Sequence, residues 1–167
     1  MMLGAARQAP HLPPATDSAL KTFLAAMATS IAPTPFSDDA GKLVLRLSIG
    51  ILILLHGLSK LADGVDGIAG MLRGAGWPGG LAYLVFVGEL LAPLLVIVGV
   101  WTRLGALLIV MNMVVAIGLA HAADLGKLGP QGGWALELQG LFLFGALAVA
   151  LLGAGRFSLG GLRGRLN

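Results

Sequence analysis

Four long apolar stretches constrain this chain more than any other feature of its sequence. They occupy roughly residues 43–61, 81–101, 104–121 and 134–152. Each approaches the about 20 residues that a helix needs to cross about 30 Å of hydrocarbon. The chain is 57% hydrophobic and only 11% charged, a balance that is not expected of a water-soluble domain of this size. The sequence therefore predicts helices that span a membrane.

Continuous apolar runs argue against a barrel of transmembrane strands. Segments such as LLAPLLVIVGV and LFLFGALAVALL lack the alternation of polar and apolar residues that is typical of barrel strands of about 10 residues. The links between the stretches are short and rich in glycine, and short links make successive helices antiparallel neighbours. The predicted fold is all-α, an integral membrane antiparallel four-helix bundle that covers residues 42–161.

The two ends of the chain differ from the bundle in composition. Residues 1–41 contain several prolines around a segment, residues 18–31, whose apolar side chains recur at helical spacing. This segment is predicted to form a short interfacial helix, with plain disorder as the alternative. Residues 162–167 form a basic tail. Lys and Arg are more numerous at the tail end of the predicted bundle, which predicts cytoplasmic N- and C-termini.

Charge and cysteine content exclude several classes of function. The net charge of +3 favours contact with the anionic lipids of a bilayer, whereas no basic run is interleaved with aromatic residues as in nucleic-acid-binding proteins. Nucleic acid is therefore not an expected partner. The sequence contains no cysteine, which excludes dithiol redox chemistry, thiolate metal sites and disulfides. Any redox chemistry must therefore use a bound cofactor.

Ionisable side chains inside the apolar stretches are the candidates for function, because a charge at mid-bilayer costs about 2.5–3.5 kcal/mol even on lenient insertion scales. Five of them can converge in the outer half of the bundle: His56, Lys60, Glu89, His121 and Glu137. Counting residues along the helices places His56 and Glu89 at matching depths. Pro93 has no N–H and should free the carbonyl of residue 89 from the helical ladder. The alternative is that these groups only fix helix packing.

Other polar residues are predicted to lie away from this cluster. Arg46, Arg103 and Arg156 sort to the cytoplasmic boundary as anchors. Asn112 and Gln139 are expected to face away from the cluster and to form hydrogen bonds across helices. The sequence has no Glu-x-x-His pair of the kind that bundle metal sites use, so no metal is expected. A proton or ion path is poorly supported, because polar residues do not continue from the cluster to the cytoplasmic side.

An ordered set of segments resembles the DoxX family of small bacterial four-helix membrane proteins, over essentially residues 42–161. These segments are LRLSIGILILLHGLSKL, GELLAPLLVIVGVWTRLGAL, His121 and LELQGLFLFGALAVALLGAGRFSLG. The positions that match the family pattern are Arg46, His56, Gly57, Lys60, Glu89, Gly99, Arg103, His121, Glu137, Gly153, Gly155, Arg156, Ser158 and Leu159. Ala154 and Gly160 depart from it, because Pro and Asp are usual there.

The resemblance implies quinone-linked redox work in a bacterial inner membrane. Relatives include the membrane subunit of a thiosulfate:quinone oxidoreductase, and others are associated with oxidative or quinone stress. By this resemblance, His56, Lys60, Glu89, His121 and Glu137 would bind a quinone, and His56 and Glu89 would relay protons. A soluble redox protein or partner subunit would deliver the electrons. The alternative is a non-catalytic membrane scaffold that recruits soluble redox or stress enzymes.

Overall fold

The computed structural model describes residues 17–31, 35–161 and 166–167, and the chain divides into two units at residue 34. The first unit contains a described helix, α1 (Asp17–Ile31). Lys21 pairs with Asp17 across one turn of this helix at 2.6 Å, and its exposed apolar side chains are Leu20, Phe23, Leu24 and Met27. The helix predicted near residues 18–31 is thus present, and its interfacial placement stays a prediction.

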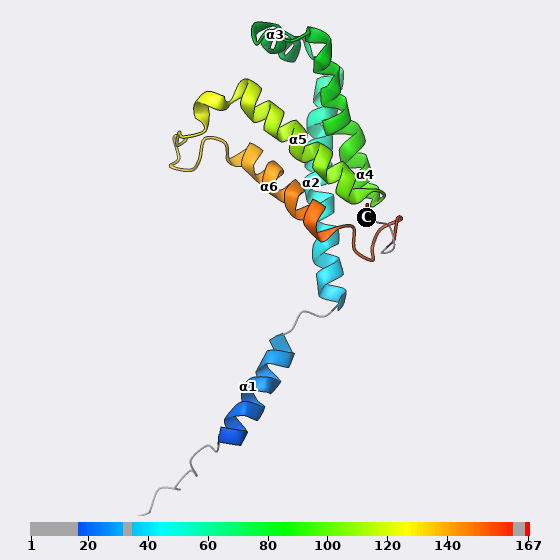
Figure 1. The fold of residues 1–167 in the computed structure, drawn as a ribbon, viewed down its shortest axis with the longest axis vertical. Helices are drawn as coiled ribbons and strands as arrows, with labels where there is room; N and C mark the ends of the chain where they lie inside the picture. Colours follow the sequence, from blue (N-terminus) through cyan, green and yellow to red (C-terminus); the bar gives the residue numbers. More distant parts are fainter. Residues whose placement is uncertain (1–16, 32–34, 162–165) are drawn as a thin grey trace, which may run out of the picture. The chain divides into compact units, whose positions relative to one another are not determined.

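The second unit is built from helices and the turns between them, and Figure 1 shows their order along the chain. The elements are α2 (Pro35–Asp63), α3 (Asp66–Gly74), η1 (Gly79–Leu84), η2 (Val87–Leu91), α4 (Ala92–Val98), α5 (Thr102–Ala120), η3 (Ala122–Asp124) and α6 (Glu137–Leu152). The segments η1, η2 and α4 follow one another as one interrupted helix, which begins as a 3-10 turn, passes through a π-helical turn and ends as an α-helix. The predicted all-helical class is confirmed for the described residues.

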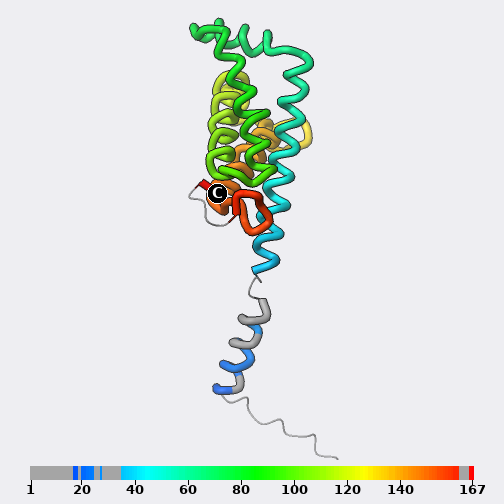
Figure 2. Tube along the Cα trace, turned by 90° about the vertical axis from the view of Figure 1, so that its right-hand side faces the viewer, coloured from blue at the N-terminus to red at the C-terminus, as the bar shows by residue number. Residues whose placement is uncertain are grey.

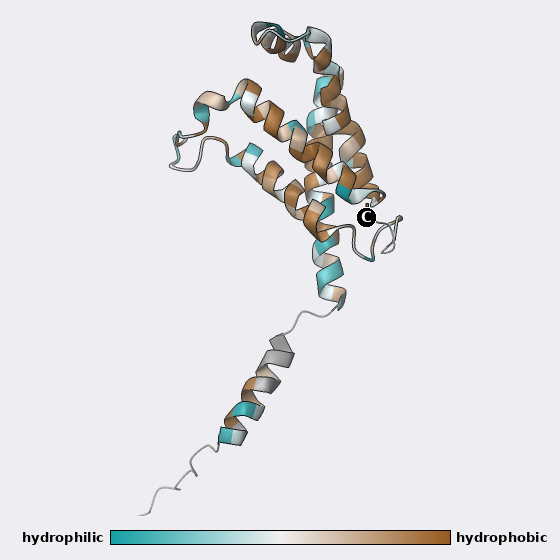
Figure 3. Ribbon diagram, in the orientation of Figure 1, coloured by the Kyte–Doolittle hydropathy of each residue, from teal (hydrophilic) through white to brown (hydrophobic). Residues whose placement is uncertain are grey.

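Three helical stretches of the described chain are long and apolar enough to cross a membrane: residues 35–63, 79–98 and 102–120. They overlap the first three predicted spans, and the first of them begins earlier than predicted. The fourth predicted span forms the apolar helix α6, which has 16 residues and is therefore about 24 Å long at 1.5 Å per residue. Figure 3 shows the hydrophobic residues concentrated on α4, α5 and α6, while the link between α5 and α6 is more hydrophilic.

Small residues let the helices of the second unit approach closely. The helix α5 packs against α4 and α6, and α2 packs against the same two helices, as Figure 2 also shows. A Cβ atom added to Gly105 would lie 2.8 Å from the carbonyl oxygen of Ala92, and one added to Gly50 would lie 2.6 Å from Ile97. Close approach through small residues is typical of helix contacts in membranes. The buried core between them includes Ile53, Ala92, Val96, Ala106, Ile109 and Ala146.

The C-terminal segment is fastened to the helices by two arginines. Arg46 is only 2% exposed, and its two terminal nitrogens each donate a hydrogen bond of 2.6 Å, to the carbonyls of Ala154 and Phe157. Arg103 donates at 3.0 Å to the carbonyl of Ala150 and at 3.0 Å to the backbone oxygen of Asn167. Both guanidinium groups therefore bind backbone oxygens of residues that follow or end α6.

The prediction that Arg46 is a boundary anchor for lipid is therefore wrong. The chain leaves α6 through Gly153 and Gly155, whose φ angles of 77° and 71° belong to the left-handed region that favours glycine. This turn directs carbonyl groups onto the guanidinium, which then lies in protein instead of lipid headgroups. Ala154 keeps the carbonyl that proline would present at this position, so this departure from the family pattern preserves the contact. The side chain of Arg156, in contrast, stays 64% exposed.

Candidate functional site

The candidate site is a largely apolar pocket of about 870 Å³ between α5 on one side and α3, η1 and η2 on the other. Side chains three and four residues apart form both walls, as expected for two helix faces. One wall contains Leu81, Leu84, Val85 and Gly88, and the other contains Leu108, Met111, Asn112, Val115 and Leu119. The charged, amide and imidazole groups that line the pocket are those of Lys60, Glu89, Asn112 and His121.

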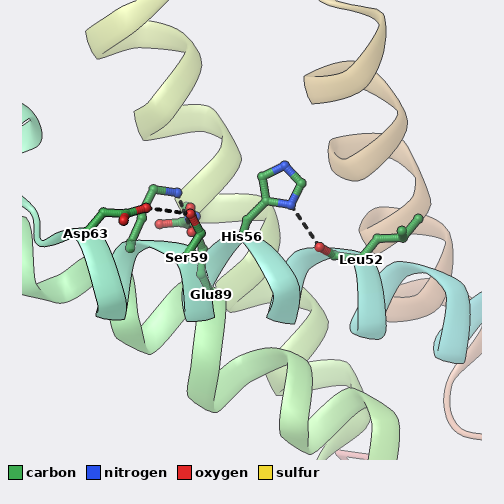
Figure 4. A network of polar contacts seen from close by, with 7 residues as sticks. Leu52, His56, Ser59, Asp63 and Glu89 are labelled. Carbon is green, nitrogen blue, oxygen red and sulfur yellow. Dashed lines mark hydrogen bonds and ion pairs between the residues drawn. The ribbon is translucent and has the colours of Figure 1, made fainter.

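A buried carboxylate lies at the inner end of this pocket. Glu89 is 4% exposed, and its Oε2 forms an ion pair with the ammonium group of Lys60. The side-chain amide of Asn112 donates a hydrogen bond of 3.2 Å to Oε1. A buried carboxylate without partners would be costly, and here each oxygen has a donor. Figure 4 shows Glu89 beside Ser59 and Asp63 of α2, and these two residues form their own hydrogen bond of 2.9 Å.

Two glycines allow the three side chains of this group to meet. A Cβ atom on Gly57 would lie 2.3 Å from the carbonyl oxygen of Glu89, so the backbones of α2 and η2 touch at this point. A Cβ atom on Gly88 would lie 2.5 Å from Cβ of Asn112, so α5 and η2 are also in close contact. Any larger residue at either position would separate helices that carry the polar groups.

The backbone around Glu89 is irregular, as the sequence leads one to expect. Residues Val87–Leu91 form a π-helical turn, and Pro93 follows in the first turn of α4. Proline lacks the N–H that would continue the helical ladder four residues after Glu89. Single π-helical turns inside longer helices occur frequently at functional sites, and here the turn carries the buried carboxylate.

Asn112 belongs to the site, and the prediction that it faces away is wrong. That prediction counted 100° per residue between Asn112 and His121. The helix α5 ends at Ala120, and His121 follows it with φ of −132° and ψ of 12°, so helical periodicity does not extend to its side chain. A polar residue in the middle of the apolar α5 is the sequence signal that could have identified Asn112, since such residues usually have a function or a polar partner.

His121 lines the pocket at the α3 end and also contacts the link between α5 and α6. Its Nδ1 lies 3.8 Å from a carboxylate oxygen of Asp124, and its Nε2 lies 3.3 Å from the amide nitrogen of Gln139. His121 is thus in contact with an amide group on one side of its ring and a carboxylate on the other. Gln139 thus bonds across helices as predicted, but its partner is one of the candidate site residues.

The electrostatics of this link are set by Lys127. Its ammonium group donates a hydrogen bond of 3.0 Å to Asp124, and this bond and its charge lower the pKa of the Asp124 carboxyl, with a smaller contribution from His121. His121 therefore joins the apolar pocket to a charged pair that is open to solvent.

His56 and Glu137, the other two predicted site residues, do not line the pocket. His56 is exposed, its ring packs edge-to-face on Phe142 at a centroid distance of 5.3 Å, and its Nδ1 lies 2.8 Å from the carbonyl oxygen of Leu52. Figure 4 shows the ring directed away from Glu89. The reason is that α2 turns Gly57 toward η2, so the neighbouring His56 faces α6.

Glu137 is exposed at the start of α6, and its carboxylate folds back against Gly133. The structure therefore brings together Lys60, Glu89 and Asn112, with His121 further along the same pocket. Among the described residues, no group of three or more His, Cys, Asp or Glu side chains could hold a metal ion.

Comparisons with known proteins agree on the family. Residues 41–122 match the family model described as DoxX, which confirms the resemblance over that part of the chain, and all four polar pocket residues lie within this range. A protein of Bacillus subtilis (strain 168) named "Putative oxidoreductase CatD" is 35% identical over 81 residues, which are 48% of this chain and 60% of that protein. The match thus spans about three fifths of the relative. No solved structure matches this chain.

Proposed function

This chain belongs to the DoxX family through residues 41–122, and from that premise we propose that it is a quinone-binding component of a membrane redox or oxidative-stress system. The name of the Bacillus relative contains the word oxidoreductase, which supports a redox role. The observation that carries the proposal is the Lys60–Glu89–Asn112 group, hereafter the polar apex, at the inner end of an apolar pocket.

The pocket fits a quinone in size and in chemistry. Ligand pockets are commonly about 300–1,000 Å³ in volume, mostly apolar, with a few polar groups that fix orientation, and this one is about 870 Å³. A quinone ring needs hydrogen-bond donors for its carbonyl oxygens. Lys60 is about one third exposed and has N–H groups beyond the one that binds Glu89. The apolar walls would contact the ring and its tail.

The residues of the chain would then have distinct roles. Lys60 donates a hydrogen bond to a ring oxygen, Glu89 orients Lys60, and Asn112 holds Glu89. A bound quinone would supply the capacity to accept electrons and protons, and electrons would come from a partner subunit or a soluble redox protein, since this chain has no dithiol of its own. His121 and Asp124 would connect the pocket to solvent. These positions favour Lys60 over His56 as the group that serves the ring.

A binding measurement on the full chain tests the proposal. Trp77 lines the pocket, whereas Trp101 and Trp134 do not, so a bound quinone should quench the Trp77 component of the fluorescence. We expect saturable quenching by a decyl-tailed benzoquinone or naphthoquinone, its loss in Trp77→Phe, and affinity about ten-fold weaker in Lys60→Met, which corresponds to one hydrogen bond to a charged donor. His56→Ala is the matched control and should bind normally. Unchanged affinity in both Lys60→Met and Glu89→Gln would refute the proposal.

A scaffold without redox chemistry is the second candidate. The observation that favours it is that both oxygens of Glu89 already have partners within the protein, as a group that only fixes packing would. Under this reading, Lys60→Met and Glu89→Gln lower thermal stability in detergent, and the wild-type chain shows no saturable quenching by quinone.

We also propose that α6 is the fourth membrane crossing of an antiparallel bundle in the bacterial inner membrane, with both termini cytoplasmic. A helix shorter than the bilayer is accommodated by local thinning or by its flanking residues, and Lys and Arg favour the cytoplasmic side. The cysteine-free sequence allows a direct test. A membrane-impermeant maleimide added to intact cells should label Lys127→Cys and should not label Leu159→Cys; the reverse result would invert the topology.

A further inference from the structure

We infer that a tailed ligand enters and leaves the pocket sideways, from the bilayer, through the gap between η1 and α5, and that its apolar tail lies in this gap when it is bound. This rests on the proposed function, because it concerns the same pocket and the same class of ligand, a quinone with an apolar tail. It adds the route of entry and the residues that control it.

The pocket forms a wedge, because the helices that carry its two walls touch at one point and separate from there. Gly88 and Asn112 form the point of contact, where there is no room even for a Cβ atom on the glycine. From there α5 diverges from the interrupted helix toward the end that carries α3, as Figure 1 shows. The polar apex lies at the closed end, so a ring bound there must have its tail directed toward an opening.

Exposed pocket-lining side chains mark where the wedge is open. Leu84 on η1 and Met111 and Val115 on α5 all line the pocket, and all three are exposed at the surface. They belong to stretches 79–98 and 102–120, which are long and apolar enough to cross a membrane. In a bilayer this rim therefore faces lipid, and it presents only apolar groups to a tail.

A second rim lies at the α3 end, and its chemistry is different. Met71 and Trp77 are exposed there, but they lie outside the three span-capable stretches, and His121 with its charged neighbours is on the same side of the pocket. A tail directed that way would leave the hydrocarbon and meet polar groups and water. The lateral gap keeps the tail in lipid throughout, since the tail has no favourable interaction with water.

Two neighbouring valines provide a matched pair of variants. Val115 and Val114 are 55% and 51% exposed on α5, but only Val115 lines the pocket. Val115→Phe fills the gap with a ring, whereas Val114→Phe adds the same ring to the adjacent lipid-facing surface. Neither change adds a tryptophan, so quenching of Trp77 still reports on binding. Val115→Leu is a milder version of the first change.

The test compares a decyl-tailed quinone with the same ring without its tail, using the full chain in detergent micelles. We expect Val115→Phe to weaken binding of the tailed quinone about ten-fold, the effect of overpacking a filled gap, and to weaken binding of the tailless ring much less. Val115→Leu should give a smaller loss for the tailed quinone, and Val114→Phe should match the wild type for both ligands.

Several results would overturn the inference. Equal effects of Val115→Phe on both quinones, or no effect on either, would show that the tail does not occupy the gap. A tail-specific loss in Met71→Phe instead of Val115→Phe would place the route at the α3 end. If a second copy of the chain covered the gap, Val115→Phe would change the mass measured by light scattering and leave quinone binding intact. Failure of the proposed function is distinguishable, because then neither quinone quenches Trp77 in the wild-type chain.

Discussion

The contact between α2 and η2 allows a sharp test in which a single methyl group is added. In Gly57→Ala the new Cβ atom would lie 2.3 Å from the carbonyl oxygen of Glu89 and 2.7 Å from its carbonyl carbon. Ordinary van der Waals contacts begin near 3.4 Å, so one backbone must move by about 1 Å. Overpacking of this kind costs about 1–3 kcal/mol, and a backbone atom cannot rotate away as a side chain can.

A matched control lies in the same helix. Gly41 of α2 has no atom within 4 Å of an added Cβ, so Gly41→Ala should gain helix propensity, up to about 1 kcal/mol, without a clash. Gly57→Ala gains the same propensity and loses the contact. The difference between the two variants therefore isolates the clash, at about 2 kcal/mol, or about 4–8 °C in melting temperature for a chain of this size.

The assay is thermal unfolding of both variants in the same detergent, followed by circular dichroism, together with quinone titration monitored by Trp77. We expect Gly57→Ala to melt below the wild type and to bind quinone more weakly, because the shift separates Lys60 from Glu89. Gly41→Ala should melt at or above the wild-type temperature and bind normally. If the two alanine variants melt at the same temperature, α2 and η2 do not touch as described and the reasoning fails.

Three further predictions concern ion pairs and arginine contacts. Lys60→Met leaves the Glu89 carboxylate without its counter-ion and should lower the free energy of unfolding by about 2 kcal/mol, less than for a fully buried pair because Lys60 is partly exposed. The double variant Lys60→Met with Glu89→Leu should melt at a higher temperature than Lys60→Met alone, and a lower melting temperature would contradict this. Arg46→Lys keeps the charge but cannot reach both carbonyls that the guanidinium binds, so it should lower the melting temperature by about 4–8 °C, equivalent to about 2 kcal/mol; an unchanged value would show that one contact suffices. Lys127→Ala removes the main cause of the lowered pKa of Asp124, so that pKa should rise toward its ordinary value in a carboxyl NMR titration. A carboxyl whose pKa is lower in the folded than in the unfolded protein stabilises the fold at pH values above its unfolded pKa, and this stabilisation is lost as the pH falls through its folded pKa. The melting temperature of the variant should therefore fall less than that of the wild type as the pH is lowered; an equal fall would contradict this.

The helices were predictable because their cause is local. Continuous apolar runs and the glycines between them indicate where the helices lie, and the turn at Gly99 and Trp101, with φ of 77° and 48°, falls where the second apolar stretch was expected to stop. The helix α2 begins at Pro35, earlier than the apolar run at residue 43, because proline at the first position and polar residues after it also form helix. Polarity alone does not reveal such an extension.

The site was predictable only in part, because it depends on helix rotation. Charge in an apolar stretch marked Lys60 and Glu89 as groups that need a partner, and the structure pairs them with each other. The positions of the charged residues in the sequence could not show that Gly57 faces η2, which turns the neighbouring His56 toward Phe142. Asn112 was misplaced because its angle was measured against His121, which lies beyond the end of α5.

The burial of Arg46 has a consequence for the order of events during synthesis. Its acceptor carbonyl on Ala154 comes 108 residues later in the chain, so α2 must enter the membrane long before the groups that complete its arginine have been translated. During that interval the guanidinium lacks its final partners, and water and lipid phosphates are available to it instead. The carbonyl groups that finally bind Arg46 become available only when α6 and the turn after it have been synthesised. We therefore expect the helices to reach their final packing late, after the C-terminal segment has been made.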